Sequence, residues 1–181
     1  MADQDKSKKT RDHWPLRVFL IAVALSAVMS FCSSAALEDS GIWIPILVLV
    51  IFIALGIVFD MIGVAVTAAD PRPFHSMAAH GEKGGREAIR LLNKSNKVSS
   101  ICNDVVGDIC GIVSGTTGAV LVTLLQRAAG TGSIILSVGV TALISGLTIG
   151  GKALGKSFAM NNCTDVVFAA GRFLAVFHRA H

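Results

Sequence analysis

Three aspartates lie inside long apolar stretches of the chain, where their side chains could carry chemistry: Asp60, Asp104 and Asp108. A carboxylate at membrane depth costs several kcal/mol unless it is paired, protonated or hydrated. Asp104 and Asp108 are four residues apart, so a helix places both on one face. Clustered carboxylates with water are the ligands that Mg²⁺ takes in proteins. The aspartates therefore predict a divalent-cation site.

Other polar residues extend this predicted site. Asn103 adjoins the face of the two spaced aspartates, and Ser114 places a hydroxyl deeper in the same helix. We therefore expect metal ligands that converge from different helices, namely Asp60, Asn103, Asp104 and Asp108. We expect Lys152 and Ser114 to modulate the site, and Mg²⁺ to be its bound or transported ion.

The depth of these groups leaves two arrangements open. Counting along each apolar stretch at about 1.5 Å per residue places Asp60, Asp104 and Lys152 towards the cytoplasmic side. In the first arrangement the acids form a cation pocket, with Lys152 at its edge or inside it as a tethered ammonium. In the second, Asp60 and Lys152 form a structural ion pair while Asp104 faces water.

The elements that must position these residues are membrane helices. Of 181 residues, 52% are apolar and 15% are charged, and the mean hydropathy is +0.66. One soluble core of this size could not hide so much apolar surface, whereas a bilayer is itself apolar. The expected fold is an all-α membrane protein with about four spans: Trp14–Leu37, Ile42–Ala69, Val98–Leu125 and Ser133–Gly151.

The first span has an alternative interpretation. The basic tail at residues 1–13 followed by an apolar stretch also resembles a secretory signal peptide, with cleavage near Ala35 and Ala36. The apolar stretch is longer than a usual signal core, which favours a span that is retained.

Two polar segments complete the expected architecture. Residues 70–97 begin with two prolines that end the preceding helix. Short helices at 74–80 and 86–92, joined by glycines, would then lie along the membrane surface. The tail at 152–181 is amphipathic and mildly basic, with an interfacial helix expected at 166–177.

The basic residues predict the orientation. Nearly all lysines and arginines lie in the N-terminal tail, the segment 70–97 and the C-terminal tail. The positive-inside rule then places both termini and this segment in the cytoplasm. We expect a plasma-membrane protein whose partner is the lipid bilayer, and no nucleic-acid partner, because membrane orientation accounts for the positive charge.

A row of glycines predicts close helix packing. Gly107, Gly111 and Gly115 recur every four residues in the third span. Such a row lets backbones approach closely, either inside the bundle or across a homodimer seam, and the pattern alone does not separate the two.

The chain carries no recognisable catalytic pattern. No nucleophile and base occur at suggestive spacing, and the four cysteines form neither a Cys-x-x-Cys pair nor a zinc spacing. We therefore expect no catalytic residues, no cofactor-binding residues and no enzyme activity.

An ordered series of motifs runs from Phe59 to about Phe177. Residues 86–93 read Arg-Glu-Ala-Ile-Arg-Leu-Leu-Asn, residues 101–108 read Ile-Cys-Asn-Asp-Val-Val-Gly-Asp, and residues 151–159 read Gly-Lys-Ala-Leu-Gly-Lys-Ser-Phe-Ala. In this order they resemble motifs of the transmembrane domain of the CorB/CorC and cyclin-M magnesium transporters. The resemblance implies a three-span dimeric domain over 42–151 that binds a dehydrated Mg²⁺. In the family, cytoplasmic CBS domains usually follow this domain.

The chain departs from the family pattern at several positions. A family glutamate falls on Lys152, a proline on Gly155 and an asparagine on Gly107, while residues 59–63 keep no serine. We expect an extra span at 14–37 before the domain and no CBS domain after it. The resemblance implies divalent-cation binding or transport. The alternative is a non-transporting membrane scaffold or regulatory subunit, in which Lys152 occupies the cation site and a membrane or CBS-containing protein is the partner.

Overall fold

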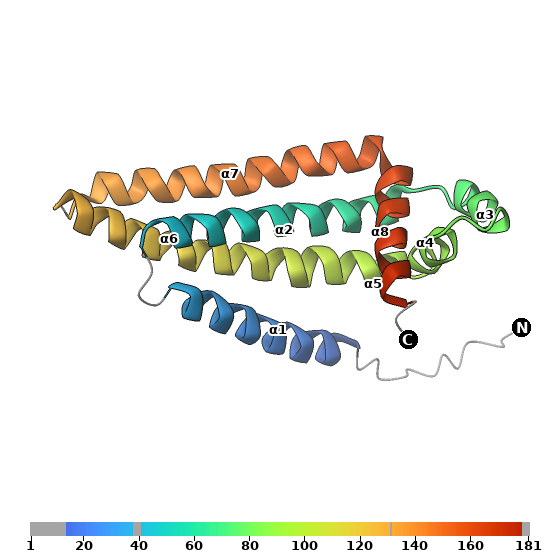
Figure 1. Ribbon diagram of the computed structural model, residues 1–181, viewed down its shortest axis with the longest axis horizontal. Coiled ribbons are helices and arrows are strands. Elements are labelled where there is room, and N and C mark those ends of the chain that lie inside the picture. The colour runs from blue at the N-terminus through green and yellow to red at the C-terminus, as the bar shows by residue number, and fades with distance from the viewer. Residues whose placement is uncertain (1–13, 38–40, 131, 179–181) are drawn as a thin grey trace, which may run out of the picture.

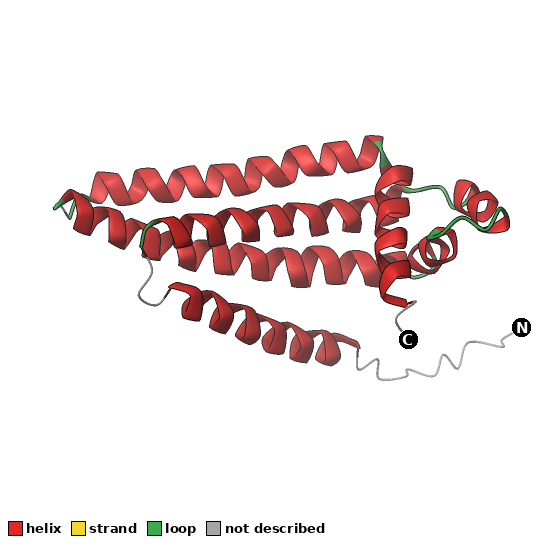
Figure 2. Ribbon diagram, viewed as in Figure 1, coloured by secondary structure: helices red, strands yellow, loops and turns green. Residues whose placement is uncertain are grey.

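The computed structural model describes residues 14–37, 41–130 and 132–178, and within these ranges the regular structure is helical with no strand (Figure 2). The elements are α1 (Trp14–Leu37), α2 (Trp43–Ala68), α3 (Arg72–Ala79), α4 (Gly85–Leu92), α5 (Ser95–Ser100), η1 (Ile101–Gly107), α6 (Asp108–Ala129), α7 (Ile134–Asn161) and α8 (Cys163–His178). The prediction of an all-α chain is confirmed for the described residues.

Among the described residues, three helices are long and apolar enough to cross a membrane. They are α2, the continuous helix formed by α5, η1 and α6 over Ser95–Ala129, and α7. The expected first span is helical over Trp14–Leu37, and it contains the apolar helical stretch Val18–Phe31. The structure therefore supports a membrane-embedded chain with three candidate spans, and the expected fourth span stays a prediction.

The spans form a layered bundle. α2 contacts both α6 and α7, and α1 lies along the η1–α6 helix (Figure 1). Val105, Ile109 and Val113 pack against apolar side chains of α1. Large apolar side chains on the outer surface, such as Trp43 and Ile135, are mostly exposed. A bilayer would cover such a surface.

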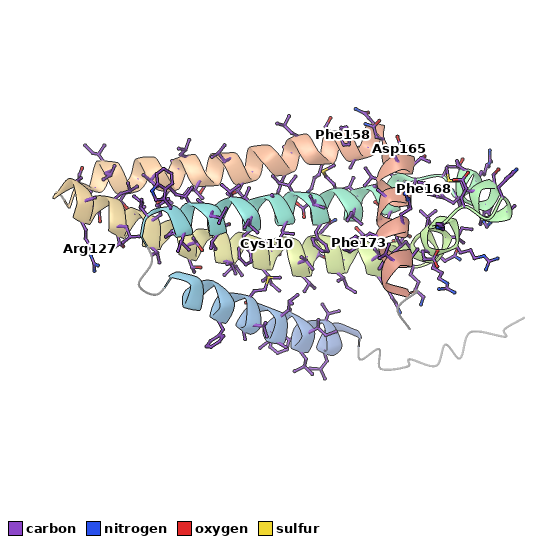
Figure 3. All side chains as sticks on the ribbon, viewed as in Figure 1. Cys110, Arg127, Phe158, Asp165, Phe168 and Phe173 are labelled. Carbon is purple, nitrogen blue, oxygen red and sulfur yellow. The ribbon has the colours of Figure 1, made fainter. Side chains whose placement is uncertain are left out.

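One end of the bundle carries a compact core of its own. α8 lies across the ends of the spans, with α3 and α4 beyond it (Figure 1). Buried residues of five helices meet there: Ala65, Val66, Phe74, Ala88, Ala159 and Val167. Figure 3 shows Arg127 at the opposite end of the bundle from α8, which carries Asp165, Phe168 and Phe173. The expected short helical pair corresponds to α3 and α4.

The boundaries of the last two helices differ from the prediction. Residues 152–161 were expected in the tail, but they continue α7 to Asn161. They contain no proline that would end a helix, so the α-helix continues past the apolar stretch. The turn before α4 uses glycines as expected, because Gly81 and Gly84 have φ of 73° and 101°, a region that glycine adopts readily.

Candidate functional site

Asp60 is a buried carboxylate in the middle layer of the bundle. It lies on α2, and its side chain is only 4% exposed. A Cβ atom added at Gly107 would lie 2.5 Å from its Oδ1 atom. Glycine at position 107 therefore lets the η1 backbone approach the carboxylate, as small residues do at membrane-helix contacts.

Lys152 reaches this carboxylate from α7. Its Nζ atom lies 3.4 Å from Asp60 Oδ2 and donates to the carbonyl oxygen of Gly107 over 3.2 Å. Its aliphatic stem passes near Gly56. Residues of α2, η1 and α7 thus meet at one point, where one ammonium balances one carboxylate. Such a pair is far less costly at membrane depth than either charge alone.

The η1 segment is a π-helix, in which each turn holds more residues than a turn of α-helix. It carries Asn103, Asp104 and Gly107. Short π segments inside α-helices occur frequently at functional sites. Here the π segment is the part of the third span that faces Asp60 and accepts the Lys152 hydrogen bond.

Asn103 lies at the same seam between α2 and η1. Its Nδ2 atom donates to Ser99 Oγ over 3.2 Å, while its Oδ1 atom is buried without a hydrogen-bond partner among the described residues. The amide lies directly against Gly63, where an added Cβ would overlap it. Gly63 follows Asp60 by three residues, so both lie on one face of α2. A buried acceptor without a partner is rare in proteins.

The other predicted ligands lie elsewhere. Asp104 and Asp108 are exposed, and Asp104 Oδ2 accepts a hydrogen bond from Ser100 Oγ over 2.9 Å. Ser114 is buried, but its hydroxyl donates to the carbonyl of Gly111 in its own helix. Among the described residues, no three His, Cys, Asp or Glu side chains are grouped so that they could hold a metal. The expected pocket of three carboxylates is not formed, because Asp60 faces the bundle while Asp104 and Asp108 face outward.

The glycine row is divided between two environments. Gly107 packs against Asp60, whereas a Cβ added at Gly111 or Gly115 would meet no atom within 4 Å. Of the three glycines, only Gly107 therefore packs inside the bundle. Gly111 and Gly115 lie on an open surface of the chain.

The glycines that bring α2 against its neighbours were not predicted as packing positions from the sequence. A Cβ added at Gly56 would lie 3.2 Å from Cys110 Cβ, and one at Gly155 would lie 2.9 Å from Ile57 Cγ2. On α2 the spacing does indicate close packing, because Gly56, Asp60 and Gly63 recur on one helix face.

No family model, curated protein or solved structure matches the chain significantly. The arrangement of Asp60, Lys152, Gly107 and Asn103 is therefore the feature that bears on function.

Proposed function

We propose that the chain is a non-transporting membrane scaffold or regulatory subunit in which the Lys152 ammonium takes the place of a cation. One observation carries this proposal, namely the position of Lys152 Nζ 3.4 Å from Asp60 and 3.2 Å from the Gly107 carbonyl. The resemblance to the CorB/CorC and cyclin-M transporters supports it, since Lys152 stands where that family has a glutamate.

Electrostatics explains why a tethered ammonium would exclude a metal ion. Asp60 supplies one negative charge, and Lys152 already balances it. At 4 Å and an effective dielectric constant near 20, two like unit charges repel by about 4 kcal/mol, and a divalent ion would meet about twice this repulsion. The Gly107 carbonyl, an oxygen of the type that binds cations, is also engaged by the ammonium.

A second candidate function is divalent-cation binding or transport, with Mg²⁺ as the ion. The observation that favours it is the buried Asn103 Oδ1 atom, an oxygen without a partner beside the face of α2 that carries Asp60. The Lys152 side chain is 23% exposed, so its flexible stem could move the ammonium towards water. Such a movement would leave Asp60 and Asn103 as oxygen ligands for an incoming ion.

Substitution of Lys152 separates the two functions. In the scaffold function the parent does not bind Mg²⁺, and Lys152→Glu gains binding because it removes the ammonium and adds a carboxylate. Lys152→Met is the matched control, since it removes the charge, keeps a long side chain and adds no ligand. Calorimetry and thermal shifts with Mg²⁺ measure the outcome on the full chain.

The opposite result would identify the cation-binding function. Binding by the parent that Asp60→Asn abolishes, and that Asp104→Asn leaves intact, would contradict the scaffold proposal. If neither the parent nor Lys152→Glu responds to any divalent ion, two hypotheses fail: that the chain binds a divalent cation, and that Lys152 occupies a former cation site. Asp60 and Lys152 would then be a structural ion pair alone.

The proposal includes an orientation and partners. Both termini and the segment 70–97 are placed in the cytoplasm of a plasma-membrane protein. External thiol labelling of a cysteine-free variant should reach Gly132→Cys and miss Lys83→Cys, and the reverse pattern would contradict this orientation. The partners are a second copy of the chain and a membrane or CBS-containing protein.

A further inference from the structure

A basic pocket lies between α4 and α8, away from the Asp60–Lys152 site. Its volume is about 670 Å³, and its charged lining comprises Lys83, Arg86, Arg90 and Arg172 together with Glu82 and Glu87. Four cations and two carboxylates give a formal charge of +2. The four cations are exposed. The ion pairs Arg72–Asp70 and Lys152–Asp60 do not involve a pocket cation.

The two walls of this pocket are held by backbone contact. A Cβ added at Gly171 would lie 2.6 Å from the carbonyl oxygen of Gly84 and 3.0 Å from the backbone nitrogen of Ala88. A Cβ added at Gly84 would lie 2.7 Å from the backbone nitrogen of Arg172. Since only glycines allow this approach, the N-terminal end of α4 is fixed against α8, and the cations of both helices face one cavity.

The remaining part of the lining is apolar. Ala175 and Val176 of α8 line the pocket together with Ala78 of α3 and the glycines Gly81 and Gly84, and Val176 is 70% exposed. α8 lies across the ends of the spans (Figure 1), the direction of a helix that lies in the plane of a membrane surface. The pocket therefore combines positive charge with an exposed apolar wall, beside the ends of the candidate spans (Figure 1).

We propose that this pocket binds the headgroup of an acidic phospholipid in the membrane leaflet next to α8. The phosphate would contact Arg86 and Arg172, because a guanidinium presents paired donors that match phosphate oxygens. The upper part of an acyl chain would lie against Val176. Anionic lipid surfaces attract basic residues near a membrane end, and the apolar wall favours a lipid over a free phosphate. The proposal is independent of the function assigned to Lys152.

Lipid retention by the purified full chain tests the proposal. The parent, in a neutral detergent, is exposed to equal amounts of phosphatidylglycerol and phosphatidylcholine, and bound lipid is measured by native mass spectrometry. We expect preferential retention of phosphatidylglycerol. Arg86→Gln with Arg172→Gln should weaken it roughly 25-fold, at about fivefold for each cation near the surface. Arg72→Gln is the matched control, because Arg72 is an exposed arginine outside the pocket, and it should leave retention unchanged.

The proposal would be overturned by equal retention of the two lipids by the parent, by unchanged retention in the double variant, or by an equal loss in the Arg72→Gln control. Inorganic phosphate equimolar with the lipid is added to a parallel sample. Displacement of the lipid at equimolar phosphate would mean that the pocket recognises a free anion. The assignment of a lipid headgroup as its ligand would then be wrong. If the double variant does not fold, the single variants Arg86→Gln and Arg172→Gln decide, each with an expected fivefold loss.

Discussion

The third span has two faces, and an aspartate lies at each of them in a different environment. At the inner face, Asp60 of α2 lies against Gly107, and Lys152 neutralises that carboxylate. On the outer face, Asp104, Asp108 and Gly115 are exposed. The comparison teaches that residue type alone does not make a site. On the inner face the aspartate has a counter-charge and a close backbone, whereas the outer face needs water or a partner to satisfy its charges.

The largest expected effect comes from removing the inner carboxylate. Asp60→Ala leaves the Lys152 ammonium in the bundle without its counter-charge, so the variant should lose about 3–5 kcal/mol of stability. Denaturation in mild detergent, followed by circular dichroism, measures this loss. Asp104→Ala is the matched control and should change stability by less than about 0.5 kcal/mol, because its side chain is exposed. Equal losses of stability in Asp60→Ala and Asp104→Ala would show that the inner and outer aspartates do not differ in their contribution to the fold.

An intermediate effect is expected when one methyl group is added to each face. Gly107→Ala should destabilise the bundle by about 1–3 kcal/mol, because the new Cβ would overlap Asp60 Oδ1. Gly115→Ala meets no atom within 4 Å and should be neutral or slightly stabilising, since alanine favours helix over glycine. The same denaturation measurement compares them, and a stable Gly107→Ala protein would show that the inner contact is loose.

The smallest expected effect on the bundle comes from Gly111→Leu on the outer face. A Cβ at Gly111 meets open space within one chain, so the monomer should keep its stability. If a second copy packs on this face, the leucine should weaken the dimer about 5–30-fold, from about 1–2 kcal/mol of close packing.

Native mass measurement in mild detergent gives the dimer fraction for this test. Gly146→Leu is the control, because Gly146 lies on the exposed surface of α7 and also has no neighbour within 4 Å. A parent that is monomeric under these conditions would contradict the proposed dimer. An equal loss of dimer in both variants would show that the dimer interface does not lie on the outer face of α6.

Local pattern was sufficient to predict the helices and their order. Apolar runs and glycine turns located α2, α6, α7 and the short pair α3 and α4, because each of these signals depends on neighbouring residues only. The pattern also placed Asp104 and Asp108 on a common face. It did not show whether that face turns inward, since the rotation of a helix in its bundle is set by contacts between helices.

The site was predicted only in outline for the same reason. Asp60 and Lys152 were expected at similar depths, and one of the two expected arrangements was their ion pair, which the structure contains. The unpartnered Asn103 oxygen depends on the approach of Gly63 and on the π segment. The π segment has no local sequence signal, because the extra residue in a π turn is stabilised by packing against other helices rather than by propensity.

The π segment also makes the third span tolerant of a change in chain length at one place. A π turn accommodates an additional residue without lengthening the helix, so deleting one residue from 101–107 would let this stretch return to α-helix while α6 keeps its faces. The same deletion at the start of α6, which is regular α-helix, would rotate everything that follows by about 100°. Gly111 and Gly115 would then turn away from the outer face, although neither residue had changed. A one-residue deletion could thus preserve or change the surface that this protein offers to a partner, depending on the side of Gly107 on which it falls.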